Sequence, residues 1–280
     1  MVSTKGAHME FSEISSIEEL KQYLEDKGKG HRPFFHYTTL ETLQGMLKNR
    51  RLFLTRMDKL NDAMECNAAP ERKKRVYIAS FSFGRPESVA MWYMYGTPSK
   101  KGIRLTIPNR AITQTINGFE KNPVIFSTET GKEITTEQIP VLKMIDVVYA
   151  HNGSLEHNKE KLLRKQGEFV ITAKADPELA FFVKNEIWLS ENETRMVLEF
   201  EKELPGDLVK VAIDFDYAIN NLEITANPCF NQKDIIAELK DFEKDRIHQS
   251  CAYNHVYFRE CNGCGRKTDF CKKNKKENGK

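Results

Sequence analysis

The chain has 280 residues, enough for one large domain or two small ones, and its 40% hydrophobic and 30% charged residues are ordinary for a globular protein. Its 43 basic and 40 acidic residues leave a net charge of +3, which by itself predicts no nucleic-acid partner. No apolar run approaches the ~20 residues of a membrane span, and the first residues lack the apolar centre of a signal peptide. We therefore expect a soluble cytoplasmic protein with no membrane partner.

The two ends of the chain are expected to lie outside the main domain. Gly6-Ala7-His8-Met9 resembles the remnant of an expression tag. Residues 1–10 are therefore assigned to a tag, and the natural sequence is expected to begin at Met9. The predicted domain covers 11–248. A Cys-rich segment and a basic tail follow over 249–280.

Hydrophobic periodicity and capping residues predict the elements in chain order. Ser16 with Glu19, and Thr38 with Glu41, form capping boxes before amphipathic stretches. Helices are predicted at 17–24, 40–47, 87–95, 154–164, 176–188 and 231–247. Strands are predicted at 33–37, 52–55, 76–82, 103–107, 141–149, 194–201 and 208–215, with a loop-rich stretch at 109–137.

This order of helices and strands has no steady β-α-β alternation, which favours an α+β fold over a doubly wound one. The chain contains neither a G-x-G-x-x-G sequence nor a P-loop. A Rossmann or P-loop nucleotide site is therefore not expected.

Three short segments at strand boundaries carry the polar side chains of most interest. Phe35-His36-Tyr37-Thr38 ends one strand and runs into a helix. Ser80-Phe81-Ser82 ends an apolar strand, and Glu191-Asn192-Glu193-Thr194-Arg195 leads into another. The informative feature is their order: a histidine, then S-x-S, then E-x-E before a strand.

With these segments, the chain resembles an uncharacterised bacterial family related to the ADP-ribosyltransferase superfamily. The resemblance covers roughly residues 33–230. The matching residues are His36-Tyr37, Asn61-Asp62 with Glu65, Ser80-Phe81-Ser82, Met91-Trp92 with Tyr95, Gly102-Ile103 with Leu105, and Glu191 with Glu193 and Arg195.

The resemblance implies two split sheets that form an NAD cleft flanked by helices, and a mono-ADP-ribosyltransferase with NAD as donor. It suggests an intracellular bacterial toxin or phage-defence effector, with RNA, DNA or protein as acceptor and an antitoxin protein as a further partner. When neutral nicotinamide departs, the ribose takes on oxocarbenium character, which a nearby carboxylate stabilises.

By the same resemblance, Glu193 is the catalytic carboxylate, Glu191 orients or deprotonates the acceptor, and His36 holds the adenosine-side ribose; which glutamate is catalytic stays open. Phe81 stands where the arginine-serine-glutamate class usually has Thr, and His36 is closer to the histidine-tyrosine-glutamate class. The residues expected to bind NAD are His36, Tyr37, Thr38, Ser80, Ser82, Trp92 and Tyr95.

Each of these segments also has a structural interpretation. In that interpretation, His36 is a structural residue of an aromatic strand whose ring nitrogens are hydrogen-bonded. The aromatic stretch 91–95 then packs in the core. The stretch 191–195 is then a solvated surface whose ion pair contributes little to stability. Residues 184–188 are expected to be part of the surface and core of a helix.

The Cys-rich segment predicts a structural zinc site. Cys261 and Cys264 have C-x-x-C spacing, and Cys251 and Cys271 would complete a tetrahedral set of thiolates. His255 is an alternative ligand, and free thiols in a reducing cytoplasm are the alternative to zinc. The basic residues that follow indicate either a solvated tail or a contact with a phosphate backbone.

Two other functions stay open at this stage. The same site would hydrolyse NAD if water were the acceptor, which would make the protein an NAD glycohydrolase. The fold without catalysis would be a nucleotide-sensing or nucleic-acid-binding module. ADP-ribosyl transfer predicts that His36, Ser80 and Glu193 converge on one cleft.

Overall fold

The computed structural model combines helices with mostly antiparallel strand pairs, which is compatible with the predicted α+β class. It describes residue 14 and residues 16–31, 33–60, 70–84, 87–96, 101–127, 131–134, 140–150, 163–165, 168–170, 181–212, 215–240 and 242–251. The chain divides into two units. The first consists of Met1–His31, Phe53–Ser80 and Phe119–Val211, and the second of Arg32–Leu52, Phe81–Gly118 and Ala212–Lys280.

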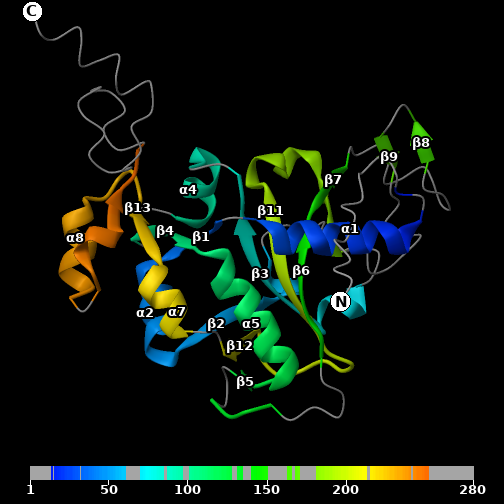
Figure 1. The fold of residues 1–280 in the computed structure, drawn as a ribbon, viewed down its shortest axis with the longest axis horizontal. Coiled ribbons are helices and arrows are strands. Elements are labelled where there is room, and N and C mark those ends of the chain that lie inside the picture. Colours follow the sequence, from blue (N-terminus) through cyan, green and yellow to red (C-terminus); the bar gives the residue numbers. More distant parts are fainter. Residues whose placement is uncertain are drawn as a thin grey trace, which may run out of the picture. The chain divides into compact units, whose positions relative to one another are not determined.

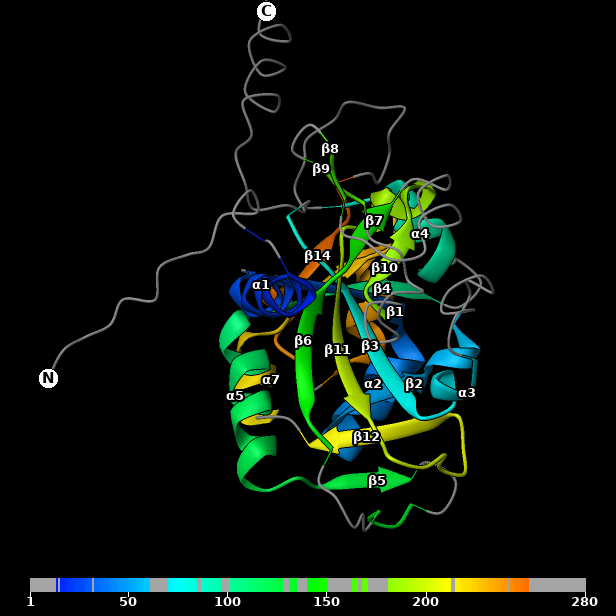
Figure 2. The ribbon, with the colours of Figure 1, turned by 90° about the vertical axis from the view of Figure 1, so that its right-hand side faces the viewer.

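In the first unit, strands β6 (Leu142–Asp146), β11 (Glu193–Glu199) and β3 (Val76–Ser82) lie side by side (Figure 2). The sheet continues from β3 through β2 (Arg51–Arg56) and β12 (Leu208–Ala212) to β5 (Ile125–Ser127). The shorter elements are η2 (Met57–Lys59), α3 (Pro70–Lys73), β7 (Val148–Ala150), β8 (Leu163–Lys165), β9 (Glu168–Val170), β10 (Val183–Asn185) and η5 (Glu186–Glu191).

Helix α1 (Ile17–Gly30) begins at the predicted capping box. Glu19 N donates to Ser16 Oγ at 3.1 Å, and Ser16 N donates to Glu19 Oε2 at 3.2 Å. The two bonds satisfy backbone donors that the first helical turn leaves without intrahelical acceptors. The sequence therefore fixes the start of this helix.

Helix α1 packs across β6 and contributes its apolar stripe to the core of the first unit (Figures 1 and 2). Leu20 and Leu24 are buried there with Ile145 of β6. The helix and strand approach closely, since a Cβ on Gly28 would lie 2.7 Å from the carbonyl oxygen of Met144. Glycine is needed at that position because any side chain would push the helix off the strand.

The second unit has the strand order β14-β13-β4-β1, and Phe35 of β1 also pairs with Ser82 at the end of β3. The strands are β1 (Phe34–Thr39), β4 (Gly102–Ile107), β13 (Glu223–Ala226) and β14 (Ile247–Gln249) (Figures 1 and 2). Its helices are α2 (Leu40–Asn49), α4 (Val89–Tyr95), most of α5 (Asn109–Lys121), α7 (Phe215–Asn221), α8 (Gln232–Glu238) and the 3-10 helix η6 (Lys244–Arg246).

Helix α4 contacts β1, and its end lies against the start of β4. A Cβ on Gly102 would lie 2.0 Å from the carbonyl oxygen of Gly96, so the two segments can meet only because residue 102 is glycine. The side-chain amide of Asn227 donates to the same Gly96 oxygen and holds the end of the helix in place.

Two of the predicted elements are wrong, and a third differs from the prediction in the few residues that the structure describes. The stretch predicted to be loop-rich contains helix α5 and strand β5. Helix α5 forms because one face buries an apolar stripe of Ala111, Ile112, Ile116 and Phe119. The polar residues between them made this stripe hard to recognise in the sequence. The described part of the predicted helix 176–188 is instead strand β10 followed by the 3-10 helix η5. The described end of the predicted helix 154–164 belongs to the hairpin of β8 and β9.

The helix predicted over 231–247 ends much earlier, at Glu238. Its apolar pattern continues, but Ile247 pairs with Ile224 in β13 instead of extending the helix. The second capping box is displaced by one residue, since the cap is Thr39, whose hydroxyl accepts from Thr42 N at 3.2 Å. Tertiary pairing and local cap geometry decide these boundaries.

No helix in the described part of the chain is long and apolar enough to cross a membrane.

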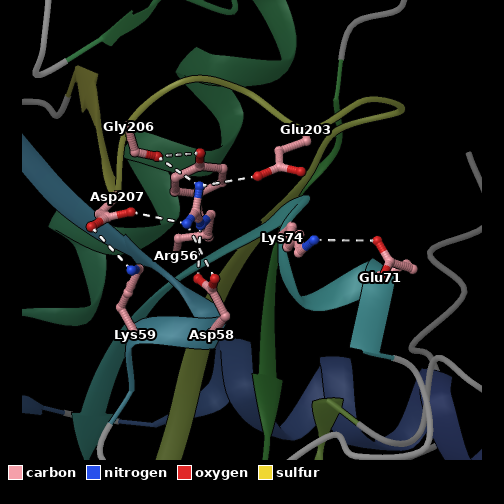
Figure 3. A network of polar contacts seen from close by, with 9 residues as sticks. Arg56, Asp58, Lys59, Glu71, Lys74, Glu203, Gly206 and Asp207 are labelled. Atoms are coloured by element: carbon pink, nitrogen blue, oxygen red, sulfur yellow. Dashed lines mark hydrogen bonds and ion pairs between the residues drawn. The ribbon is translucent and has the colours of Figure 1, made fainter.

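An ion-pair network joins β2 to the segment before β12 in the first unit (Figure 3). Arg56 Nε and Nη2 donate to the two carboxylate oxygens of Asp58 at 2.7 and 3.1 Å. Arg56 also lies 3.0 Å from Asp207 and 3.5 Å from Glu203, and donates to the carbonyl of Gly206 at 3.4 Å. One arginine thus contacts three carboxylates, one that follows β2 and two in the segment before β12.

We expect the substitution Arg56→Ala to lower the free energy of unfolding by about 1–2 kcal/mol, because it leaves three neighbouring carboxylates without their shared cation. Urea denaturation at neutral pH measures the change. The control is Lys74→Ala, which removes only the exposed 3.5 Å pair with Glu71 (Figure 3) and should cost less than about 0.5 kcal/mol. Equal effects of the two variants would contradict a stabilising network at Arg56.

Candidate functional site

The E-x-E segment of the first unit is held by its backbone at the start of β11. Asn192 adopts a left-handed conformation, with φ of 44°, between the 3-10 helix η5 and the strand. Glu193 N donates to the hydroxyl of Tyr149 at 2.8 Å, and Val147 N donates to the Glu193 carbonyl at 3.0 Å. These bonds fix where the Glu193 side chain leaves the backbone.

The Glu193 carboxylate is clamped by two cations. Arg195 Nε and Nη2 each donate to one of its oxygens at 2.8 Å, in the bidentate geometry typical of strong arginine–carboxylate pairs. Arg195 Nη1 donates to the carbonyl of Phe181 at 2.7 Å, and its side chain is fully buried. Lys184 Nζ lies 3.4 Å from Glu193 Oε2.

Lys184 also connects the two glutamates of the segment. Its Nζ is 2.5 Å from Glu191 Oε2 and lies over the ring of Trp188, 4.7 Å from the ring centroid. Glu191 is 2% exposed and Glu193 is 4% exposed. The two carboxylates and two cations therefore form one buried charge cluster, and the interpretation of 191–195 as a solvated surface is wrong.

The charge cluster keeps Glu193 ionised. Burial by itself raises the pKa of this carboxyl, but the charge and hydrogen bonds of Arg195, the charge of Lys184 and a hydrogen bond from Ser80 together lower the pKa to about 2. Burial also raises the pKa of the neighbouring Tyr149, so its phenol stays protonated. The arrangement presents an oriented carboxylate anion at neutral pH.

Of the sequence-predicted residues, the first unit brings together Ser80, Glu191 and Glu193. Sequence reasoning missed Lys184, which was placed on a helix, and Tyr149. The only sequence indication for Lys184 is its position directly after the apolar run Phe181-Phe182-Val183, where an isolated cation needs a buried partner.

In the second unit, Tyr37 and Trp92 pack together with α4. Their rings meet edge to face with centroids 4.9 Å apart, and the Tyr37 hydroxyl accepts from Ser88 N at 2.9 Å. Trp92 Nε1 donates to Glu87 Oε2 at 3.0 Å. Burial raises the pKa of Tyr37, while the charge of Arg104 opposes that rise. Trp92 is 3% exposed, as the core-packing interpretation of this helix expects.

The residues predicted to bind NAD do not all lie on one face of β1. Neighbouring residues of a strand point to opposite faces, so His36 and Tyr37 diverge. His36 lies near Phe81, with ring centroids 5.5 Å apart, whereas Tyr37 is on the face of α4. Thr38 is buried on the His36 face, and Ser82 shares the Tyr37 face through its pairing with Phe35.

Convergence of His36 with Glu193 stays a prediction, because the two residues belong to different units. Asn61, Asp62 and Glu65 fall outside the described residues.

Three of the predicted zinc ligands, Cys261, Cys264 and Cys271, also lie outside the described residues. Cys251 is described and exposed, and its backbone nitrogen donates to Glu87 Oε1 at 2.8 Å; Cys229 is exposed as well and forms no disulfide. Within the described ranges, no group of three or more His, Cys, Asp or Glu side chains is placed to hold a metal ion.

A cavity of about 380 Å³ lies in the first unit beside α1 and β6. Four of the charged residues that line it form ion pairs with one another: Arg72 forms two 2.6 Å hydrogen bonds with Glu199, and Lys143 lies 2.9 Å from Glu25. None of the predicted site residues lines it.

In comparisons with known proteins, no family model, no curated protein and no solved structure matched the chain.

The depressed pKa of Glu193 predicts an acid-dependent loss of stability. Its folded-state pKa of about 2 lies below the ordinary value of 4.5, so the stabilisation is complete above pH 4.5 and is lost as the pH falls toward 2. The difference corresponds to about 3 kcal/mol at neutral pH. Unfolding free energies of wild type and Glu193→Gln should therefore differ most at pH 7 and approach each other near pH 3.

The matched control for this titration is Glu186→Gln, an exposed position of the adjoining 3-10 helix. Its stability should run parallel to that of wild type across the same pH range. A constant gap between wild type and Glu193→Gln from pH 7 to pH 3 would show that ionisation of Glu193 does not stabilise the fold.

Proposed function

We propose that the protein is a mono-ADP-ribosyltransferase that uses NAD as donor, with Glu193 as its catalytic carboxylate. The observation that carries the proposal is the contact between Ser80 and Glu193 in the first unit. The S-x-S and E-x-E segments are more than 100 residues apart in sequence, yet they share one hydrogen-bonded cluster. A transferase of this superfamily needs that serine–glutamate pairing.

The chemistry follows from an ionised, oriented carboxylate. As the nicotinamide–ribose bond breaks, its electron pair leaves with neutral nicotinamide and positive charge develops on the ribose. Glu193 would accept a ribose hydroxyl hydrogen bond that strengthens as the charge grows. Each carboxylate oxygen accepts more than one hydrogen bond, so the Arg195 clamp and a ribose hydroxyl are compatible on the same group.

The contacts within the charge cluster indicate the roles of the other residues. Ser80 is a positioning residue, and Lys184 holds Glu191 beside Glu193. Glu191 would orient or deprotonate the acceptor. His36, Tyr37 and the other predicted contacts would hold NAD in an ADP-ribosyltransferase-like cleft between split sheets.

The proposed acceptor is RNA, DNA or protein, as for an intracellular toxin or phage-defence effector with an antitoxin partner. The basic tail would contact a nucleic-acid backbone, and a Cys-rich zinc knuckle within 249–280 would hold that segment. NAD hydrolysis would use the same carboxylate with water as acceptor.

A second function is favoured by the burial of the charge cluster. Glu191 and Glu193 are 2% and 4% exposed, and both already bind buried cations. A cluster that only stabilises the fold has this arrangement. The protein would then be a non-catalytic nucleotide-sensing or nucleic-acid-binding module.

Radiolabelled NAD incubated with separate pools of cell protein, RNA and DNA distinguishes these functions. We expect wild type to label one pool, and Glu193→Gln to reduce that labelling by about 10²-fold or more, because the charge-stabilising carboxylate is lost. Ser80→Ala should weaken labelling while keeping both cations paired. Glu186→Gln is the matched control and should label as wild type does.

Each variant is first checked for cooperative unfolding, so that loss of labelling is not loss of fold. Free ADP-ribose without labelled macromolecule would assign the protein to NAD hydrolysis. Intact NAD with wild type in every pool, or full activity of a folded Glu193→Gln, would refute the transferase and support the binding module.

A further inference from the structure

Arg104 occupies the middle of the sheet in the second unit. It lies on β4, paired in register with Tyr37 on one side and Thr225 on the other. The residue is 7% exposed, and its guanidinium lies over the Phe35 ring, 4.6 Å from the ring centroid. Nη2 donates to Thr225 Oγ1 at 3.1 Å.

The other polar neighbour of this guanidinium is the Tyr37 hydroxyl, whose pKa the charge and hydrogen bond of Arg104 lower. Nε and Nη1 are buried and form no hydrogen bond with any described residue. No described carboxylate forms an ion pair with Arg104. Glu87 acts on the nearby Tyr37 through its charge, but its own oxygens accept from Trp92 Nε1, Ser250 Oγ and Cys251 N. A buried positive charge without a counter-ion is costly to the fold.

Ser82 supplies a second unpartnered polar group on the same face. Its Oγ is buried and forms no hydrogen bond with any described residue, and the residue is 7% exposed. Ser82 pairs in register with Phe35, the residue whose ring lies under Arg104. Directly opposed residues of neighbouring strands share a face, so the serine hydroxyl and the guanidinium flank one aromatic ring.

We propose that Arg104 and Ser82 form a binding site for a phosphate group. Nε, the two hydrogens of Nη1 and the serine hydroxyl offer four donor hydrogens, which suit the several oxygens of a phosphate better than the two of a carboxylate. The bound anion would supply the missing counter-charge in surroundings of low dielectric, where the attraction is strong. The phosphate belongs either to free inorganic phosphate or to a nucleotide.

This inference goes beyond ADP-ribosyl transfer and does not depend on it. A protein that only binds a nucleotide would use the same phosphate site. Glu193 lies in the other unit, so substitutions there leave the phosphate site unchanged.

The site has a signature that a purely structural arginine lacks. Arg104→Met removes a buried charge that no carboxylate compensates, so the ligand-free protein should keep or raise its melting temperature. The same variant should lose stabilisation by phosphate. A structural arginine, by contrast, would lower the melting temperature when replaced.

Melting temperatures are measured at constant ionic strength for wild type, Arg104→Met, Ser82→Ala and Arg110→Gln, with inorganic phosphate, ADP or acetate as the titrant. Arg110 is the control, since it also lies over an aromatic ring of this unit, 4.6 Å from the Tyr217 centroid, but is exposed. Phosphate compounds should stabilise wild type and Arg110→Gln. Apparent affinity should fall at least tenfold in Arg104→Met and several-fold in Ser82→Ala.

A stronger response to ADP than to inorganic phosphate would support a nucleotide as the source, and equal responses would support free phosphate. The proposal is overturned if neither compound stabilises wild type, if Arg104→Met responds like wild type, or if acetate acts as well as phosphate. Glu193→Gln should respond as wild type does, even if the chain transfers no ADP-ribose.

Discussion

The first unit depends on the pairing of Glu193 with Arg195 inside the protein. That pair, extended by Lys184 and Glu191, joins the ends of β10, η5 and β11 through side chains rather than through a continuous sheet. Removing one partner leaves an uncompensated buried charge, which costs far more than the intact pair contributes. We therefore expect the short strand β10, the 3-10 helix η5 and the left-handed conformation of Asn192 to form and unfold together.

The two buried arginines of the described chain show opposite solutions to the same electrostatic problem. Arg195 has a carboxylate and a carbonyl for its guanidinium, and its charge is neutralised within the protein. Arg104 has the hydroxyls of Thr225 and Tyr37 and the aromatic face of Phe35, but no described carboxylate neutralises its charge. A folded chain tolerates the second arrangement only when other interactions supply the stability, which is the usual situation of binding sites.

The sequence predicted what depends on local pattern and missed what depends on tertiary pairing. Ser16 and Glu19 capped α1 as expected, and the strands around His36 and Ser80 lie where their aromatic and apolar runs placed them. The segment after Phe181 was taken for a helix because parallel pairing of β10 with β7 leaves no periodic signature. Lys184 could not be assigned to the site for the same reason, whereas Ser80 and Glu193 were found through motif order.

Each unit contains one of the chain's two tryptophans. Trp92 is buried edge-on to Tyr37 in the second unit, and Trp188 lies beneath the Lys184 ammonium in the first. Indole emission depends on nearby charge and polarity, so the two residues should fluoresce differently. Single Trp→Phe versions would let the unfolding of either half be followed optically in the intact chain, without attaching a dye.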